Sequence, residues 1–373
     1  MAVRVISVRE ALDPQTRWDA VLDARSPAEF ALDRWPDAKS WPVLDDDERR
    51  LVGTEYKQIS AFDARKRGAA MVARRIAGLL DAHSASLPRD WQPLVYCWRG
   101  GQRSGTLAWF LDQVGFRVHL LKGGYKAFRC VVREDLDTLP NALRFVVIGG
   151  RTGSGKSRLL QTLATHGAQV LDLESLACHR GSVLGALPGQ PQPSQKQFET
   201  RVWQALRGFD PLRPVFVESE SRKIGAVQVP QALILRMRQH GRVGLVDMPL
   251  PARVHLLLED YAHFSQDVPG FGALLEHFVE LRGRERVLRW KAMAEQGHWA
   301  EVFEELVCEH YDPLYGRSMD QNYSGMSQAL PITLRDGGAQ ALREAAQELI
   351  AQEGALFERF EPFEPFKLLA SRP

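Results

Sequence analysis

The sequence predicts an α/β protein with two units that contain parallel sheets, followed by a helical C-terminal part. Two observations predict this fold class. Short apolar runs of strand length alternate with amphipathic stretches, and a glycine-rich pattern typical of phosphate-binding loops follows one such run near the middle of the chain. The 373 residues suffice for two or three domains, and the 45% hydrophobic content provides a sizeable core and excludes wholesale disorder.

The first unit is expected over residues 1–135. Apolar runs at 20–23, 93–96 and 116–121 predict buried strands, and residues 107–114 carry apolar side chains at the i, i+3, i+4, i+7 spacing of a helix. This alternation predicts a parallel sheet with crossover helices.

A second α/β unit is expected after a polar linker at residues 136–142, which contains Pro140 as a breaker. The unit is expected over 143–260, and a helical, charged C-terminal part over 261–373. The strands of the second unit are predicted at 145–148, 168–172, 214–218 and 253–258.

Composition limits the partners and the location. The formal net charge of +2 is too small to indicate a nucleic-acid partner and does not exclude one. The four cysteines lie at least 33 residues apart without a CxxC pair, so we expect no structural metal site and no disulfide framework. We see no signal peptide in the sequence, and every apolar run is far shorter than the ~20 residues of a membrane span. We therefore expect a cytoplasmic protein with reduced thiols and no membrane partner.

The first motif is a cysteine at a strand–loop–helix junction. Backbone N–H groups and the positive end of the following helix would stabilise the thiolate of Cys97, the candidate catalytic residue, and hold an anion above it with the help of Arg99 and Arg103. The alternative is a buried structural cysteine at a strand end. The candidate anion-binding loop consists of Trp98, Arg99, Gly100, Gly101, Gln102, Arg103 and Ser104.

Two further stretches accompany this loop. Together with Asp23–Phe30 (DARSPAEF) and Leu121–Gly124 (LKGG), the loop resembles a rhodanese-like domain. Common sulfurtransferase loops have the spacing Cys-x4-Arg, whereas this loop is Cys-x5-Arg, as in Cdc25-type and tyrosine phosphatases. A phosphatase therefore stays an alternative, although Tyr96 stands where tyrosine phosphatases carry His.

The second motif is a full G-x4-G-K-S pattern between a predicted strand and a predicted helix, which predicts a P-loop NTPase-like domain. Its N–H groups would bind a polyphosphate, Lys156 would neutralise the far phosphate, and Ser157 is placed for Mg²⁺. No guanine-specifying N-K-x-D is present, and a P-loop small-molecule kinase is a second alternative. The predicted diphosphate-binding residues are Gly150, Arg151, Thr152, Gly153, Ser154, Gly155, Lys156 and Ser157.

Four acidic residues follow predicted strands of the second unit. Such strand-end carboxylates can hold Mg²⁺ beside a P-loop; solvated strand ends are the structural alternative. They are Asp172, Glu174, Glu218 and Glu220.

A cysteine loop of this kind joined to a P-loop is an unusual pairing. From about residue 5 to residue 320 the chain resembles the bacterial tRNA 2-selenouridine synthase family. Cys178 departs from the family's L-A-x-H-R-G-S element, where Asn is expected. The matching stretches are Tyr96–Gly101, Gly149–Ser157, Asp172–Ser182, Gln192–Glu199 and Val217–Gly225.

The resemblance implies a transferase that acts on tRNA carrying 2-thiouridine at the wobble position. The family transfers a geranyl group from geranyl diphosphate to that sulfur, and then replaces the geranylthio group with selenium from selenophosphate. These two compounds are the implied co-substrates, and a selenophosphate-producing enzyme is an expected partner. We assign the diphosphate to the P-loop and the selenium donor to the loop around Cys97.

Basic residues are candidates for contacts with RNA or substrate. On one predicted helix, Arg282, Arg286 and Arg289 would share a face suited to phosphate contacts, and an ordinary solvated helix is an equal alternative. Four residues nearer the predicted site could contact the donor diphosphate or the tRNA backbone, or form structural ion pairs: His179, Arg180, Arg222 and Lys223.

Overall fold

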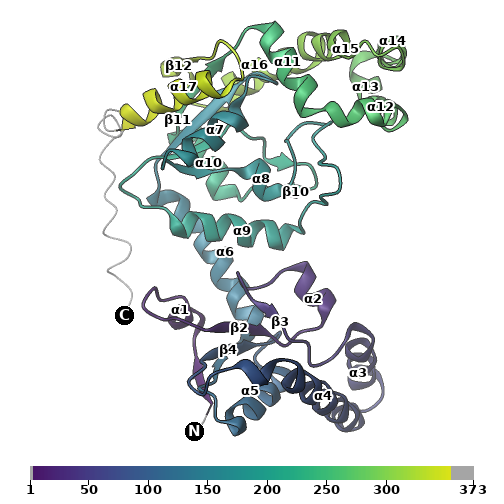
Figure 1. Cartoon of the computed structure of the whole chain (residues 1–373), viewed down its shortest axis with the longest axis vertical. Coiled ribbons are helices and arrows are strands. Elements are labelled where there is room, and N and C mark those ends of the chain that lie inside the picture. Colours follow the sequence, from purple (N-terminus) through teal and green to yellow (C-terminus); the bar gives the residue numbers. More distant parts are fainter. Residues whose placement is uncertain (1–2, 354–373) are drawn as a thin grey trace. The chain divides into compact units, whose positions relative to one another are not determined.

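The computed structural model describes residues 3–353, so the last part of the predicted C-terminal region, 354–373, lies outside the described residues. The chain divides into two compact units, both drawn in Figure 1. Unit 1 consists of Met1–Asp135 and Ser194–Gln204, and unit 2 consists of Leu136–Pro193 and Ala205–Pro373.

Unit 1 is built on a five-stranded parallel sheet with the strand order β1-β5-β4-β2-β3. The expected strands at 20–23 and 93–96 have these bounds, and the third begins at His119. The strands are β1 (Arg4–Ile6), β2 (Ala20–Asp23), β3 (Lys39–Ser40), β4 (Pro93–Tyr96) and β5 (His119–Leu121). The helices are α1 (Val8–Ala11), α2 (Pro27–Leu32), α3 (Asp46–Gln58), α4 (Ala61–His83), α5 (Gln102–Val114) and α6 (Gly124–Ala142).

The predicted linker at 136–142 is wrong, because these residues form the last turns of helix α6, which contains Pro140. Buried Val132 and Leu136 continue the helical spacing into this polar stretch. Near the end of a helix, proline costs only one hydrogen bond to an earlier carbonyl, so the helix continues through it.

Helix α9 (Gln195–Gly208) falls within the range 143–260 that was assigned to the second unit, but its residues 195–204 belong to unit 1. Trp203 is buried and its Nε1 donates to Asp135 Oδ2 at 2.8 Å. Arg129 of α6 donates to Thr200 Oγ1 at 2.8 Å and also pairs with Glu199. These contacts join a segment 60 to 70 residues downstream to the first sheet's domain, which no local pattern predicts.

Unit 2 contains a second five-stranded parallel sheet, with the order β12-β11-β6-β8-β7. Its strands are β6 (Phe145–Gly150), β7 (Gln169–Leu171), β8 (Val215–Glu218), β11 (Arg242–Asp247) and β12 (Leu330–Thr333). A separate antiparallel pair is formed by β9 (Lys223–Ile224) and β10 (Val227–Gln228).

The predicted strand at 253–258 is wrong, because helix α11 (Leu250–Asp260) occupies this stretch. Pro249 caps the helix and a second proline lies in its first turn, a position that proline favours. Buried Val254 and Leu257 have helical spacing. The strand of this region is β11, where Gly244 interrupts the apolar run and makes room for Ile332 of β12.

The C-terminal part is helical as predicted, except that β12 adds an edge strand to the sheet and α17 packs against α7. None of the described helices has the length and hydropathy to cross a membrane. The remaining helices are α7 (Lys156–Thr165), α8 (Leu173–Ala177), α10 (Gln231–His240), α12 (Val268–Leu275), α13 (Val279–Arg282), α14 (Arg284–Glu295), α15 (Trp299–Glu305), a π-helical turn at Leu306–Tyr311, α16 (Asp312–Asn322) and α17 (Ala339–Ala351).

Candidate functional site

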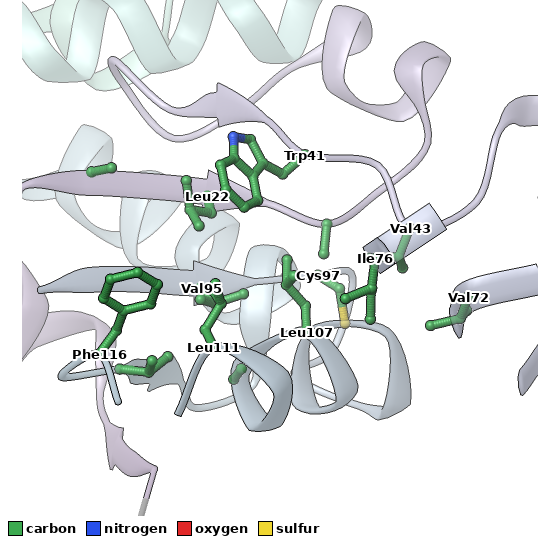
Figure 2. Close-up of a cluster of buried hydrophobic side chains, with 14 of the residues drawn as sticks. Leu22, Trp41, Val43, Val72, Ile76, Val95, Cys97, Leu107, Leu111 and Phe116 are labelled. Atoms are coloured by element: carbon green, nitrogen blue, oxygen red, sulfur yellow. The ribbon is translucent and has the colours of Figure 1, made fainter. Parts of the chain in front are cut away.

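Cys97 lies at the carboxyl end of β4, directly before the loop that leads into α5. Its side chain is buried, and Figure 2 shows it beside Val43, Ile76 and Leu107. Ser104 Oγ donates a hydrogen bond to Cys97 Sγ at 3.0 Å. The Ser104 hydroxyl can therefore stabilise a thiolate at this position.

The loop after Cys97 is held tightly against the start of α6. The N–H group of Tyr125 donates to the Cys97 carbonyl oxygen at 2.8 Å. At Gly124, which has φ +56°, a Cβ would overlap both this oxygen and the N–H group of Gly100. The second glycine of the LKGG element is therefore required by the close approach of two backbone segments.

The two arginines of the loop differ in their surroundings. Arg103 pairs with Glu29 at 2.6 Å, the glutamate of the DARSPAEF element. Burial opposes the charged form of Glu29, but the hydrogen bond from Arg103 prevails and lowers its pKa. Arg99 is exposed. The structure thus gives Arg103 a partner across the loop and leaves Arg99 as the more accessible of the two cations.

Asp23 and Arg25 of the DARSPAEF element and Tyr96, which precedes Cys97, have structural roles. Arg25 is buried and forms hydrogen bonds with Asp23 at 2.6 to 3.0 Å, and Tyr96 donates to Asp23 Oδ2 at 2.7 Å. Burial raises the pKa of Tyr96 well above its ordinary value. The residue in the position of the phosphatase histidine is thus a neutral phenol anchored in the core.

In unit 2 the phosphate-binding loop connects β6 to α7, as its motif predicts. Lys156 Nζ donates to the carbonyl oxygens of Gly150 at 2.6 Å and Arg151 at 3.2 Å, so its ammonium spans the loop. Burial lowers the pKa of Lys156, although nearby Glu174 and Glu220 favour its charged form. Ser157 Oγ donates to Glu174 Oε2 at 2.7 Å.

The four predicted acidic residues gather beside this loop. Glu218 is 2% exposed, so it is no solvated strand end, and its Oε1 accepts from the N–H group of Glu174 at 2.7 Å. Burial raises the pKa of Glu218 well above its ordinary value and also raises that of Asp172. Burial, followed by the charge of Glu174, raises the pKa of Glu220 to about 8. Burial and mutual repulsion therefore favour the protonated forms of these carboxylates, and a bound cation would oppose this effect.

A cavity of about 400 Å³ adjoins Ser157 at the end of the loop and two of these carboxylates, Asp172 and Glu174. Arg180 lies 5.0 Å from the ring centroid of Tyr261 and donates to the Asp260 carbonyl oxygen. His179 is buried, and its Nδ1 accepts from the N–H group of Gly181 at 3.1 Å. The cavity is lined by Ser157, Arg158, Gln161, Asp172, Glu174, Ser175, His179, Arg180, Leu187, Leu257, Asp260 and Tyr261.

The remaining basic candidates lie apart from the cavity lining. Arg222 and Lys223 are exposed at the β9–β10 pair.

The three arginines assigned to one helix face do not share a helix. Gly283, with φ +84°, separates Arg282 in α13 from α14. Arg286 pairs with Glu309 at 2.8 Å, and Arg289 pairs with Glu305. Acidic partners on the following helical segment therefore neutralise these side chains, which favours the structural alternative over phosphate contacts.

Three residues that support the phosphate-binding loop were not predicted from the sequence: Arg253, Asp312 and Tyr315. Buried Arg253 donates to the Thr152 carbonyl oxygen at 2.8 and 3.0 Å and to both oxygens of Asp312 at 2.6 and 2.9 Å. The hydroxyl of Tyr315 accepts from the N–H group of Gly150. Arg253 lay within the wrongly predicted strand, and no local motif marks the other two.

Comparisons with known proteins match both units. Residues 7–129 match the family profile described as "Rhodanese-like domain", and 143–270 match "tRNA 2-selenouridine synthase AAA domain". The "tRNA 2-selenouridine synthase" of Shewanella piezotolerans is 31% identical over 350 residues, with 86% of this chain and 94% of that protein covered. The chain belongs to the tRNA 2-selenouridine synthase family. It is therefore a tRNA-modifying enzyme.

Two other similar proteins match a smaller part of this chain. The "tRNA 2-selenouridine synthase" of Nitrosomonas europaea is 37% identical over 245 residues, which are 65% of this chain and 63% of that protein. A crystal structure titled N-terminal domain of putative ATP/GTP binding protein from Clostridium difficile 630 is 31% identical, with a TM-score of 0.31 over 34% of this chain and 98% of that chain.

Cys178, which stands where the family's L-A-x-H-R-G-S element has Asn, should affect the stability of unit 2. Cys178 has φ +50° and ends α8 in the left-handed region, which Asn tolerates better than other side chains that carry a Cβ. We expect Cys178→Asn to raise the melting temperature of unit 2 by about 1–3 °C in calorimetry. Cys178→Ala, which removes the thiol without this conformational benefit, should not raise it.

A second prediction concerns the carboxylate cluster. Because the pKa of Glu220 is about 8 instead of 4.5, the folded chain binds more protons than the unfolded chain between these values, and stability falls as pH rises across them. Glu220→Gln should remove this loss. The unfolding free energy of the variant minus that of the original chain should therefore increase by ~2 kcal/mol from about pH 6 to pH 8. Urea unfolding measures this difference, with Glu344→Gln, at an exposed position of α17, as the control. An equal gain at both pH values would contradict the prediction.

Proposed function

We propose that this enzyme converts the wobble 2-thiouridine of tRNA into 2-selenouridine in two steps. In the first, the sulfur attacks C1 of geranyl diphosphate, the C1–O bond breaks, and diphosphate leaves with the bonding electrons. In the second, the selenium of selenophosphate bonds to C2 of the base, geranylthiol leaves, and water cleaves the P–Se bond so that phosphate is released. Alkylation makes the second step feasible because an alkylated sulfur leaves as a thiol far more readily than a thiocarbonyl sulfur leaves.

The observation that carries the proposal is the phosphate-binding loop, whose last residue, Ser157, lines the cavity of about 400 Å³. Loop N–H groups and the start of α7 favour a diphosphate, and Lys156 would leave the carbonyl oxygens that it now contacts in order to neutralise it. Arg253 and Tyr315 hold the loop from outside through Thr152 and Gly150, so the N–H groups are fixed before the donor binds.

The residues beside the loop fit Mg²⁺. Ser157 and Glu174 offer hard oxygen donors, and Glu218 Oε2 is buried without a hydrogen-bond partner among residues 3–353. No group of three or more His, Cys, Asp or Glu side chains in the described part of the chain forms a metal cage. Mg²⁺ commonly binds through one or two side chains plus substrate phosphates, and it would neutralise the departing diphosphate here.

The second step is assigned to unit 1. Cys97 Sγ receives a hydrogen bond from Ser104, and the loop ends at the start of α5, where a positive helix end favours anions. Cys97 would position selenophosphate for the attack of its selenium on C2 of the base. A selenophosphate-producing enzyme would supply this donor.

The test is mass spectrometry of tRNA nucleosides after incubation of the chain with thiolated tRNA, geranyl diphosphate and selenophosphate. We expect 2-geranylthiouridine with geranyl diphosphate alone and 2-selenouridine with both donors. A Cys-x5-Arg phosphatase would instead release phosphate from an aryl phosphate, and a P-loop kinase would consume a nucleoside triphosphate. Either product in place of the modified nucleosides would overturn the proposal.

A further inference from the structure

Unit 1 carries an exposed apolar cluster at the turn between α3 and α4, which we call the hairpin tip: Tyr56, Ile59 and Phe62. These side chains are 56%, 78% and 65% exposed. The two helices pack against each other, and Figure 1 shows them side by side. Three large apolar side chains within seven residues mark an interaction surface, because such side chains gain nothing in contact with water.

The backbone of the hairpin tip is well fixed. Helix α3 is closed by the N–H groups of Ile59 and Ser60, which donate to the Glu55 carbonyl oxygen at 3.0 Å. The side chain of Ser60 then caps α4 by accepting from the N–H group of Asp63 at 3.2 Å. The apolar side chains therefore project from a rigid support, which lowers the entropy cost of binding a partner.

The surroundings of the hairpin tip are strongly basic. Residues 49–67 contain six Lys or Arg and two Asp or Glu, although the whole chain has a net charge of only +2. Among these cations, Lys66 pairs with Asp63 at 2.7 Å and Arg67 pairs with Glu55 at 3.4 Å. Lys66 Nζ lies 4.9 Å from the ring centroid of Phe62, and Lys57 is exposed beside Tyr56. Aromatic rings interleaved with cations are typical of surfaces on which nucleic-acid bases stack while their phosphates are neutralised.

The other face of α4 joins the hairpin tip to the core around Cys97. Val72 and Ile76 are buried in the same cluster as Cys97 (Figure 2). Ile76 lies fourteen residues along α4 from Phe62, or about 21 Å at 1.5 Å per residue. An RNA whose wobble base reaches Cys97 could therefore place other nucleotides of the same arm on the hairpin tip.

We propose that the hairpin tip is a docking surface for the tRNA substrate, where Tyr56 and Phe62 stack on unpaired bases and Lys57 and Lys66 contact phosphates. This inference rests on the proposed function, because tRNA is the partner whose charge and aromatic bases complement the surface.

The experiment measures binding of the full chain to fluorescently labelled tRNA that carries 2-thiouridine. Phe62→Leu and Tyr56→Leu keep an apolar side chain but lose the ring, and each should raise the Kd about tenfold. Phe62→Trp should bind within about twofold of the original chain. Lys57→Ala and Lys66→Ala should each reduce the slope of log Kd against log salt by ~0.7. The matched control is Leu288→Ala, an exposed leucine of α14.

The outcomes separate this inference from the proposed function. If the original chain binds and converts tRNA while the two leucine variants bind as tightly as it does, the docking surface is wrong and the proposed function stands. If those variants keep their affinity for tRNA but lose self-association in sedimentation, the surface joins two copies of the chain and the inference is overturned. An original chain that does not bind thiolated tRNA overturns the proposed function and the inference with it.

Discussion

Lys156→Ala is expected to abolish geranyl transfer, with a fall in rate of ~100-fold or more. Lys156 spans the phosphate-binding loop and is the cation closest to its carbonyl oxygens at Gly150 and Arg151. As the C1–O bond of the donor breaks, negative charge accumulates on the diphosphate, so the contact with Lys156 strengthens in the transition state. Because selenation proceeds through the geranylated base, 2-selenouridine should fall in parallel and 2-thiouridine should remain.

The control for this experiment is Lys291→Ala, which also removes one positive charge from unit 2 but at a side chain of α14 that pairs with Glu276. Its geranylation rate should match that of the original chain. A normal yield of geranylated nucleoside from Lys156→Ala, measured by mass spectrometry, would show that the phosphate-binding loop does not hold the prenyl donor. Retained melting temperature in both variants would confirm that the comparison concerns chemistry and not folding.

Features set by a few neighbouring residues could be predicted from the sequence. The loop after Cys97 and the loop before Lys156 each lie between one strand and one helix, and the structure has both arrangements. In each case the backbone pattern, the glycines and the reactive side chain occur within about a dozen residues, so local spacing specifies them. The strand-end carboxylates were also predicted, because parallel strands end at a common edge of a sheet.

Features formed by distant residues could not be predicted. The Arg253–Asp312 pair and Tyr315 reach the phosphate-binding loop from positions 101 to 165 residues away in sequence. The role of Arg253 was not predicted, because a short stretch of apolar residues is equally consistent with a buried strand and with a buried helix. The place of α9 could not be predicted either, because it depends on contacts with distant residues. Its contacts with Arg129 and Asp135 place residues 195–204 in unit 1, although the preceding and following segments of the chain belong to unit 2.

Cys97→Ala should have the opposite selectivity to Lys156→Ala, losing selenation by ~100-fold or more while geranylation continues. The thiol lies in unit 1 with a hydrogen bond from Ser104, and the phosphate-binding loop lies wholly in unit 2. A thiolate next to a helix start can receive or orient an anionic selenium donor, but it contributes nothing to the departure of diphosphate. Geranylated tRNA should therefore accumulate in this variant, whereas Lys156→Ala should accumulate 2-thiouridine.

Two controls make the Cys97 result interpretable. Cys308→Ala removes an exposed thiol of unit 2 and should leave both steps unchanged. Ser104→Ala keeps the thiol but removes its hydrogen-bond donor, so it should slow selenation without affecting geranylation if the sulfur acts as a thiolate. The two mutants of the chemical steps would then stop the pathway at different nucleosides. Formation of 2-selenouridine by Cys97→Ala at the original rate would remove unit 1 from the selenium step.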